Sequence, residues 1–204
     1  MACLSSAPRP DALAGISGPL ILSVGTLKPV KRHDLLLEAF ARLPASLGVR
    51  LCLLGDGAQR AMLEQKAQAL GIADRVFMPG FVADPGPWYA HADLFVLCSD
   101  YEGFGNVIVE ALEYGVPVVS TDCPVGPKEI LADGRFGNLV PPGDVEALAH
   151  AMTRALEEDV DRDALRKRAQ DFGLATIARR YLAVCLLTAS TLDAGVESKQ
   201  GSGI

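Results

Sequence analysis

The chain has 204 residues, half of which are hydrophobic, and a formal net charge of −6 at pH 7. The length suggests one domain or slightly more, and the hydrophobic fraction is typical of a globular chain with a sizeable core and excludes a disordered one. The acidic balance argues against nucleic acid or an anionic membrane surface as a partner.

The cysteines and the chain ends give an expectation about the compartment. Five cysteines are present, with no pair at a spacing typical of a metal or redox site. Residues 1–16 carry prolines and charges where a secretion signal would need an apolar core, and the stretch 181–192 is too short and too polar to span a bilayer. We therefore expect a cytoplasmic chain with no transmembrane segment.

The chain divides into three parts by composition. Residues 1–18 are rich in Pro, Ala, Ser and Gly and lack periodicity, so we interpret them as a linker or a disordered N-terminus. Residues 19–190 alternate apolar runs with amphipathic segments, and 191–204 is expected to be a flexible tail. The predicted strands are 20–24, 49–54, 75–78, 93–97, 116–120 and 137–140. The predicted helices lie within 35–43, 58–70, 88–92, 107–112, 123–131, 145–156, 161–170 and 174–187.

This alternation predicts the fold class. Strands alternating with helices give parallel strands joined by right-handed crossovers, which is an α/β, doubly wound, Rossmann-like sheet with helices on both faces. In such sheets ligands bind beyond the carboxyl ends of the strands. Four turns follow predicted strands and are expected to converge at one edge: Gly25-Thr26, Gly55-Asp56, Val82 and Glu102-Gly103.

Three basic residues, Lys31, Arg32 and His33, lie where the first helix begins. Acidic side chains are normally favoured there, because the helix dipole has its positive end at the N-terminus. An anion bound nearby would remove this conflict. The alternative is three solvated surface bases, because dipole effects at exposed positions are only ~0.3–1 kcal/mol.

The turn at residues 102–106 carries the clearest chemical signal. It links a buried strand to a helix whose start offers unpaired backbone N–H groups, and its two glycines let a phosphate or diphosphate approach that backbone. Glu102 and Glu110 would repel phosphate, so they suit hydroxyl groups on either side of a diphosphate, as in a nucleotide sugar. Taken singly, each is better explained structurally, Glu102 as a turn residue and Glu110 as a solvated helix residue.

Two glutamates separated by seven residues, Glu102 and Glu110, resemble the signature of the nucleotide-sugar-dependent glycosyltransferases of the GT-B fold, in particular glycosyltransferase family 4. The resemblance runs from about Leu20 to about Ala155 and covers the pattern of the family's C-terminal, donor-binding half only. Its other segments, in order, are 24–25, Lys31, 36–40, 54–57, 80–82, 93–96, 115–119, 129–130 and 137–144.

The resemblance implies a hexosyl-type transferase that moves a sugar from a UDP- or GDP-linked donor to an acceptor hydroxyl, with retention and without metal ion or cofactor. Glu102 would hold hydroxyls of the sugar, Glu110 those of the ribose, and Lys31 the departing diphosphate. The implied catalytic residues are thus Glu102 and Lys31. The implied donor-binding residues are Gly25, Thr26, Gly55, Asp56, Val82, Gly103, Phe104, Gly105, Asn106 and Glu110.

One position departs from the family pattern. An arginine usually follows the glycine aligned with Gly25, whereas this chain has Thr26. A threonine hydroxyl carries no charge, so neutralisation of the diphosphate would depend more on Lys31 and the helix N-terminus, with Lys28 or Arg32 as candidate substitutes.

The family's acceptor-binding half is not in this sequence, so three interpretations stay open: a fragment, one subunit of a split transferase with an acceptor-domain partner chain, or a domain that binds nucleotide sugars without turnover. A GT-B sugar-nucleotide epimerase is a further alternative, which the Glu102/Glu110 spacing disfavours. Dehydrogenase chemistry is also disfavoured, because the dinucleotide fingerprint that Gly103 and Gly105 would begin has Ile108 in place of its third glycine.

Overall fold

The computed structural model describes residues 7–173, 176–178 and 182 of the chain. Within these residues six parallel strands form one sheet in the order β3-β2-β1-β4-β5-β6. The strands are Leu20–Val24 (β1), Arg50–Leu54 (β2), Val76–Gly80 (β3), Leu94–Leu97 (β4), Val118–Thr121 (β5) and Asn138–Val140 (β6). The predicted fold class, a doubly wound α/β sheet, is confirmed.

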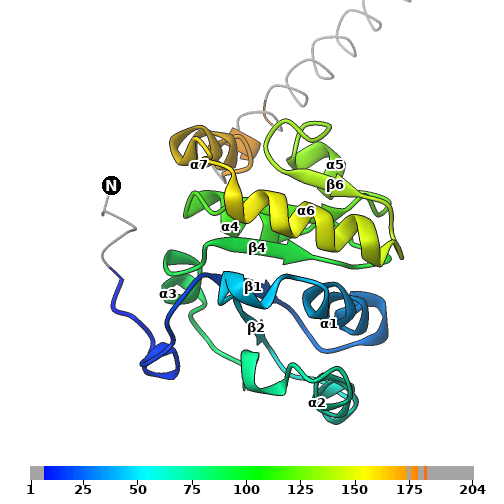
Figure 1. The fold of residues 1–204 in the computed structure, drawn as a ribbon. Coiled ribbons are helices and arrows are strands. Elements are labelled where there is room, and N and C mark those ends of the chain that lie inside the picture. Colours follow the sequence, from blue (N-terminus) through cyan, green and yellow to red (C-terminus); the bar gives the residue numbers. More distant parts are fainter. Residues whose placement is uncertain (1–6, 174–175, 179–181, 183–204) are drawn as a thin grey trace, which may run out of the picture.

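Helices cover both faces of this sheet (Figure 1). The α-helices are His33–Ala41 (α1), Arg60–Ala69 (α2), Gly86–Ala90 (α3), Asn106–Glu113 (α4), Pro127–Ile130 (α5), Val145–Glu157 (α6) and Arg162–Gln170 (α7). Single 3-10 turns occur at Asp11–Leu13 (η2), Pro29–Lys31 (η3), Ala45–Leu47 (η4) and Ala73–Arg75 (η5). The predicted helix 174–187 and tail 191–204 lie almost wholly outside the described residues.

The core has two halves separated by the sheet. Buried residues of α1, α2 and α6 pack in one cluster, and those of α3, α4, α5 and α7 pack in the other. Neighbouring residues of β1 serve opposite sides, with Ile21 in the first cluster and Leu22 in the second. Because successive side chains of a strand point to opposite faces, a strand buried on both sides needs an unbroken apolar run. This is why the strands were recognisable in the sequence as short apolar stretches.

The end of α4 shows why the fifth strand begins two residues later than predicted. Gly115 has φ 69°, and its N–H donates to the carbonyl of Leu112, while the N–H of Val116 donates to Ala111. This pattern of two bonds around a left-handed glycine is a Schellman motif, which closes the helix and satisfies its last carbonyls. Val116 therefore belongs to the helix cap, and β5 starts at Val118.

The N-terminal segment differs from the prediction of a linker or disordered end over residues 1–18. Residues Asp11–Leu13 form the 3-10 turn η2, and the Leu13 side chain is fully buried in the cluster under α3 and α4. The Arg9 guanidinium donates to the carbonyls of Leu13 and Ile16 and ties the turn together. One buried leucine in a Pro- and Ala-rich stretch produces no periodicity, so this docking could not be predicted from the sequence.

No helix among the described residues is both long enough and apolar enough to cross a bilayer.

Leu13→Ala is expected to lower the free energy of unfolding by about 2–4 kcal/mol, because it removes a fully buried side chain and leaves a cavity. Urea denaturation followed by circular dichroism measures this. Leu70→Ala is the matched control, since Leu70 is 37% exposed and should lose less than about 1 kcal/mol. Equal losses in the two variants would contradict the docked position of the N-terminal segment.

Candidate functional site

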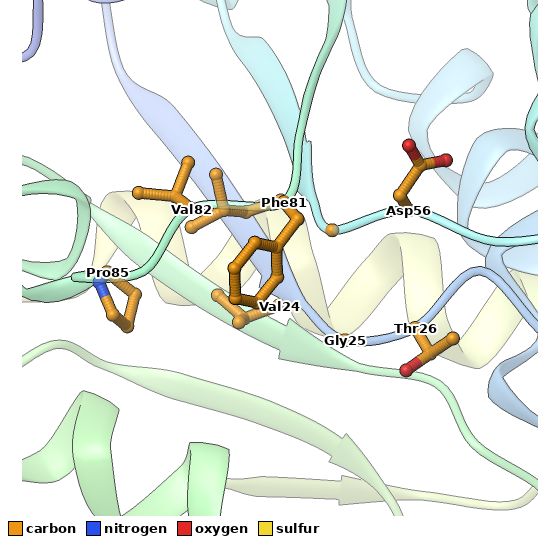
Figure 2. A pocket seen from close by; sticks show the side chains of 9 residues that line it. Val24, Gly25, Thr26, Asp56, Phe81, Val82 and Pro85 are labelled. Carbon is orange, nitrogen blue, oxygen red and sulfur yellow. The ribbon is translucent and has the colours of Figure 1, made fainter.

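The order of the strands reverses between β1 and β4, and the carboxyl ends of these strands form the topological switch point where ligands of such sheets bind. A pocket of about 280 Å³ opens beside it. It is lined by Val24, Gly25, Thr26, Leu54, Gly55, Asp56, Phe81, Val82 and Pro85. Figure 2 shows Phe81, Val82 and Pro85 on the segment after β3, with Gly25 and Thr26 on the segment that leaves β1. Three of the four predicted turns therefore line one pocket.

Two of these turns touch backbone to backbone. Gly55 has φ 141°, and a Cβ at this position would lie 2.0 Å from the carbonyl oxygen of Gly25. The N–H of Gly25 donates to Leu54, and the N–H of Gly55 donates to Gly80, which continues the hydrogen bonding past the strand ends. Only glycine fits position 55, because any side chain there would push apart two of the turns that line the pocket.

The two predicted catalytic residues contact each other directly. The Lys31 Nζ donates to Glu102 Oε1 at 2.6 Å, across 71 residues of sequence. The same oxygen accepts from the Ser99 hydroxyl at 2.6 Å. Glu102 is 8% exposed, and the Lys31 side chain is 23% exposed. The stem of Lys31 passes close to Gly25, where a Cβ would come within 3.9 Å of Lys31 Cε. The ammonium is thus held between the ends of β1 and β4.

The base-rich start of α1 is explained by these contacts. Arg32 donates to Asp34 at 3.2 Å and to Asp100 at 3.1 Å, and the hydrogen bond with Asp34 contributes most to raising the pKa of its guanidinium. His33 is buried. The interpretation as three solvated bases is therefore wrong, because carboxylates of the turn after β4 and of α1 itself supply the anions. Arg32 is bound by two carboxylates, Asp34 and Asp100.

His33, the third of these bases, has a strongly lowered pKa. Burial, and secondly the charge of Lys31, lower its pKa from 6.5 to about 4. Its Nδ1 has no hydrogen-bond partner among the described residues. The imidazole is therefore neutral near pH 7 and acts as part of the packing beneath Lys31.

The turn before α4 presents open backbone, as predicted from its glycines. Gly105 has φ 92° and stands at the N-cap position, with no side-chain cap from the described residues. A Cβ on Gly103 would meet no atom within 4 Å, so this backbone is accessible. Asn106 begins the helix and is exposed. A Cβ on Gly126 would lie 1.8 Å from the carbonyl oxygen of Phe104, so the loop after β5 supports the turn from behind.

Glu110 is half-buried and is not a freely solvated helix residue. The Tyr89 hydroxyl, from α3, donates to Glu110 Oε2 at 2.9 Å. Both glutamates thus have specific partners that the sequence did not reveal. Ser99 was detectable in principle, since it is a polar residue directly after a buried strand. Tyr89 was not, because its sequence context is that of an ordinary core aromatic.

Among the residues that the structure describes, no three His, Cys, Asp or Glu side chains are grouped so as to hold a metal ion. The aspartates before α7 have a structural role, since Asp161 accepts from the backbone N–H groups of Asp163 and Ala164 and caps that helix.

Comparisons with known proteins identify the family of this chain. The family model of the glycosyl transferases group 1 matches residues 13–172. The lipopolysaccharide core biosynthesis glycosyltransferase LpsE of Rhizobium meliloti (strain 1021) is 40% identical over 163 residues, which cover 80% of this chain and 46% of LpsE. This chain therefore belongs to the group 1 glycosyl transferases. The solved structures that it resembles are glycosyltransferases of the GT-B fold.

Two solved structures share its architecture. The lipopolysaccharide outer core galactosyltransferase WaaB superposes with a TM-score of 0.77 at 25% identity, over 89% of this chain and 52% of WaaB. HepE from Anabaena, in complex with UDP, superposes with a TM-score of 0.69 at 30% identity, over 90% of this chain and 51% of HepE. The chain spans about half the length of each of these relatives.

The buried, neutral His33 predicts a pH dependence of stability. Its pKa is lower in the folded protein than in the unfolded chain, so the unfolded chain binds the extra proton between pH 6.5 and about 4. Stability is then fully present above pH 6.5 and falls as the pH drops through this window, by up to about 3 kcal/mol. Urea unfolding at pH 7.5, 5.5 and 4.5 measures it. The His33→Gln variant should lack this part of the loss, and an identical pH profile in the two proteins would contradict the assignment.

Proposed function

We propose that this chain is the donor-binding half of a retaining, metal-independent hexosyltransferase that uses a UDP- or GDP-linked sugar. The observation that carries the proposal is the Lys31–Glu102 pair at the switch point, beside a pocket lined by Gly25, Thr26 and Val82. In this proposal the Lys31 ammonium would meet the diphosphate, and the Glu102 carboxylate would meet the sugar hydroxyls. The similarity to HepE, which was solved in complex with UDP and glucose, supports a nucleotide-sugar donor.

The donor is proposed to lie along the carboxyl edge of the sheet. Its base would occupy the pocket, where the Phe81 ring, 80% exposed, offers an aromatic face beside the backbone of Val82. The ribose hydroxyls would meet Glu110. The diphosphate would lie over Gly25 and Lys31, against the N–H groups at residues 103–106. The sugar hydroxyls would then reach Glu102.

The chemistry asked of these residues is electrostatic. As the bond between the anomeric carbon and the diphosphate oxygen breaks, negative charge grows on the leaving group, and Lys31 with the N–H groups of the 102–106 turn would stabilise it. The acceptor oxygen would bond to the anomeric carbon on the face that the leaving group vacates, which retains the configuration. Its proton would pass to the departing phosphate oxygen, so no side-chain base is required.

In this mechanism Lys31 and Glu102 would exchange their contact with each other for contacts with the donor. Each partner at present satisfies the other, with Ser99 holding the shared oxygen. A diphosphate competes for the same ammonium, and a sugar competes for the same carboxylate. A complete donor would offer both partners a replacement, whereas a nucleoside diphosphate alone replaces only one.

The acceptor site and the second half of the active site would come from outside this chain. We propose that a GT-B partner domain, in a longer chain or in a separate subunit, supplies the acceptor site, because the chain spans about half of its relatives. A domain that binds the donor without turnover is the second candidate.

The cytoplasm is the proposed compartment, since the cysteines of the described part, Cys52, Cys98 and Cys123, are buried free thiols.

Calorimetric titration with UDP and GDP tests the donor site. We expect one of the two to bind and Lys31→Met and Glu110→Gln each to weaken it by about 10- to 100-fold, since each removes a charged hydrogen-bond partner. Lys66→Met and Glu113→Gln are the matched controls. Lys66 pairs with Glu38 away from the pocket, and Glu113 lies one turn after Glu110. Failure of both nucleotides to bind the folded chain would overturn the proposed function.

Glu102→Gln should have opposite effects on two ligands. It frees Lys31 from its carboxylate, so UDP or GDP is expected to bind about three- to tenfold more tightly. The same change removes the charged acceptor for sugar hydroxyls, so any gain in affinity from an attached hexose should shrink. Titration with the bare nucleotide and with its hexose derivatives separates the two effects. Weaker nucleotide binding in Glu102→Gln would contradict the proposed exchange.

A further inference from the structure

The contact between α3 and α4 contains one polar bond inside an otherwise apolar packing. The Tyr89 hydroxyl lies 2.9 Å from Glu110 Oε2 and 3.4 Å from the carbonyl oxygen of Val107. The Tyr89 side chain is fully buried, whereas Glu110 is half-buried at the edge of this contact. A hydroxyl at the end of a buried ring therefore defines where one oxygen of a partly exposed carboxylate lies.

The ring that carries this hydroxyl is held by its neighbours. Tyr114 stacks on it with ring centroids 5.8 Å apart and 19° between the planes, and Phe95 of β4 packs against it at 5.7 Å and 47°. Gly86 admits this arrangement, because a Cβ there would come within 2.4 Å of the Tyr114 hydroxyl oxygen. The position of the Tyr89 hydroxyl is thus set by packing.

The hydroxyl is a donor at all relevant pH values. Burial, and then the charge and hydrogen bond of Glu110, raise the pKa of Tyr89 far above its ordinary value of 10. The proton therefore stays on the phenol and points to an acceptor. Of the two acceptors within reach, the carboxylate is charged and closer, and hydrogen bonds to charged acceptors are the stronger ones.

Within the described part of the chain, Glu110 has no cationic partner. Among the described residues no Lys, Arg or His nitrogen lies within ion-pair distance of it, and the protein hydrogen bond at its carboxylate goes to Oε2. Partial burial and the charge of Glu110 together raise the pKa of Glu113, one turn further along α4. Such a carboxylate is suited to hydroxyl donors, and its Oε1 receives no hydrogen bond from the described residues.

We propose that Tyr89 is a positioning residue for nucleotide recognition: it fixes the Glu110 carboxylate so that both oxygens face the two hydroxyls of the donor ribose. Oε1 accepts from one hydroxyl, and Oε2, with two lone pairs, accepts from Tyr89 and from the other. The inference rests on the proposed function and deepens it, because it makes ribose recognition depend on a residue that does not touch the ligand. The competing explanation is that the bond only joins two helices.

Discrimination between ribose and deoxyribose separates these two explanations. The full chain is titrated with whichever of UDP or GDP binds and with its 2′-deoxy and 3′-deoxy forms. The wild type should prefer the ribonucleotide, and Glu110→Gln should lose most of that preference. Tyr89→Phe keeps the ring and removes only the hydroxyl, and it should reduce the preference by about five- to tenfold. If the bond only joins the two helices, Tyr89→Phe would lower the melting temperature and leave the preference unchanged.

Two further variants make the test specific. Tyr114→Phe deletes a hydroxyl from the ring stacked on Tyr89, and it should keep the full preference. In the double variant Tyr89→Phe/Glu110→Gln the effect of Tyr89→Phe on the preference should vanish, because Tyr89 acts through Glu110.

The outcomes are distinguishable. Absence of nucleotide binding by the folded wild type overturns the proposed function and this inference with it. Normal binding, with a preference that Glu110→Gln abolishes and Tyr89→Phe leaves intact, overturns this inference alone. A preference that is equally weakened by Tyr114→Phe also overturns it, since loosened packing would then explain the effect.

Discussion

The Lys31–Glu102 ion pair is the interaction on which the candidate site depends. It joins the segments that follow β1 and β4, the two strands between which the order of the sheet reverses. A carboxylate that is 8% exposed would be costly without a partner, and removal of a partner from a buried pair is more damaging than the pair's own net contribution. The pair therefore keeps two opposite charges in a defined place at the switch point.

The surroundings of this pair explain why it can be held so closely. Ser99 donates to the same Glu102 oxygen, and Thr121 donates to the carbonyl of Ser99, so hydrogen bonds run from β5 through Glu102 to Lys31 in the turn η3. The stem of Lys31 passes beside Gly25, and Gly55 lets the neighbouring turn touch Gly25. The sheet is the rigid part, and the residues of the candidate site lie on the turns that follow its strands, as is usual for α/β folds.

The two glutamates of the signature differ in their environment, and this suits the two roles proposed for them. Glu102 is neutralised by Lys31 and sits at the strand end, whereas Glu110 has no cation within reach among the described residues and is held by a neutral phenol. A carboxylate paired with a flexible lysine side chain would suit the proposed exchange of partners with a ligand. A group that reads hydroxyl positions benefits from a packed, rigid donor. Spacing in the sequence alone makes the two positions look equivalent.

Sequence by itself determined the fold class, the order of the elements and the turns that meet at the carboxyl edge. Strands buried on both faces must be apolar runs, and parallel strands must bring their carboxyl ends to one edge. Local pattern and topology were therefore sufficient to predict that the turns with Gly25, Gly55 and Val82 meet there. Only the tertiary structure decided which charges pair. Lys31 and Glu102, or Tyr89 and Glu110, are far apart along the chain, and side-chain contacts at that range follow from packing geometry that no local periodicity records. The same reason hid the docking of Leu13 and the burial of His33, since a single residue carries no pattern until its neighbours in space are known.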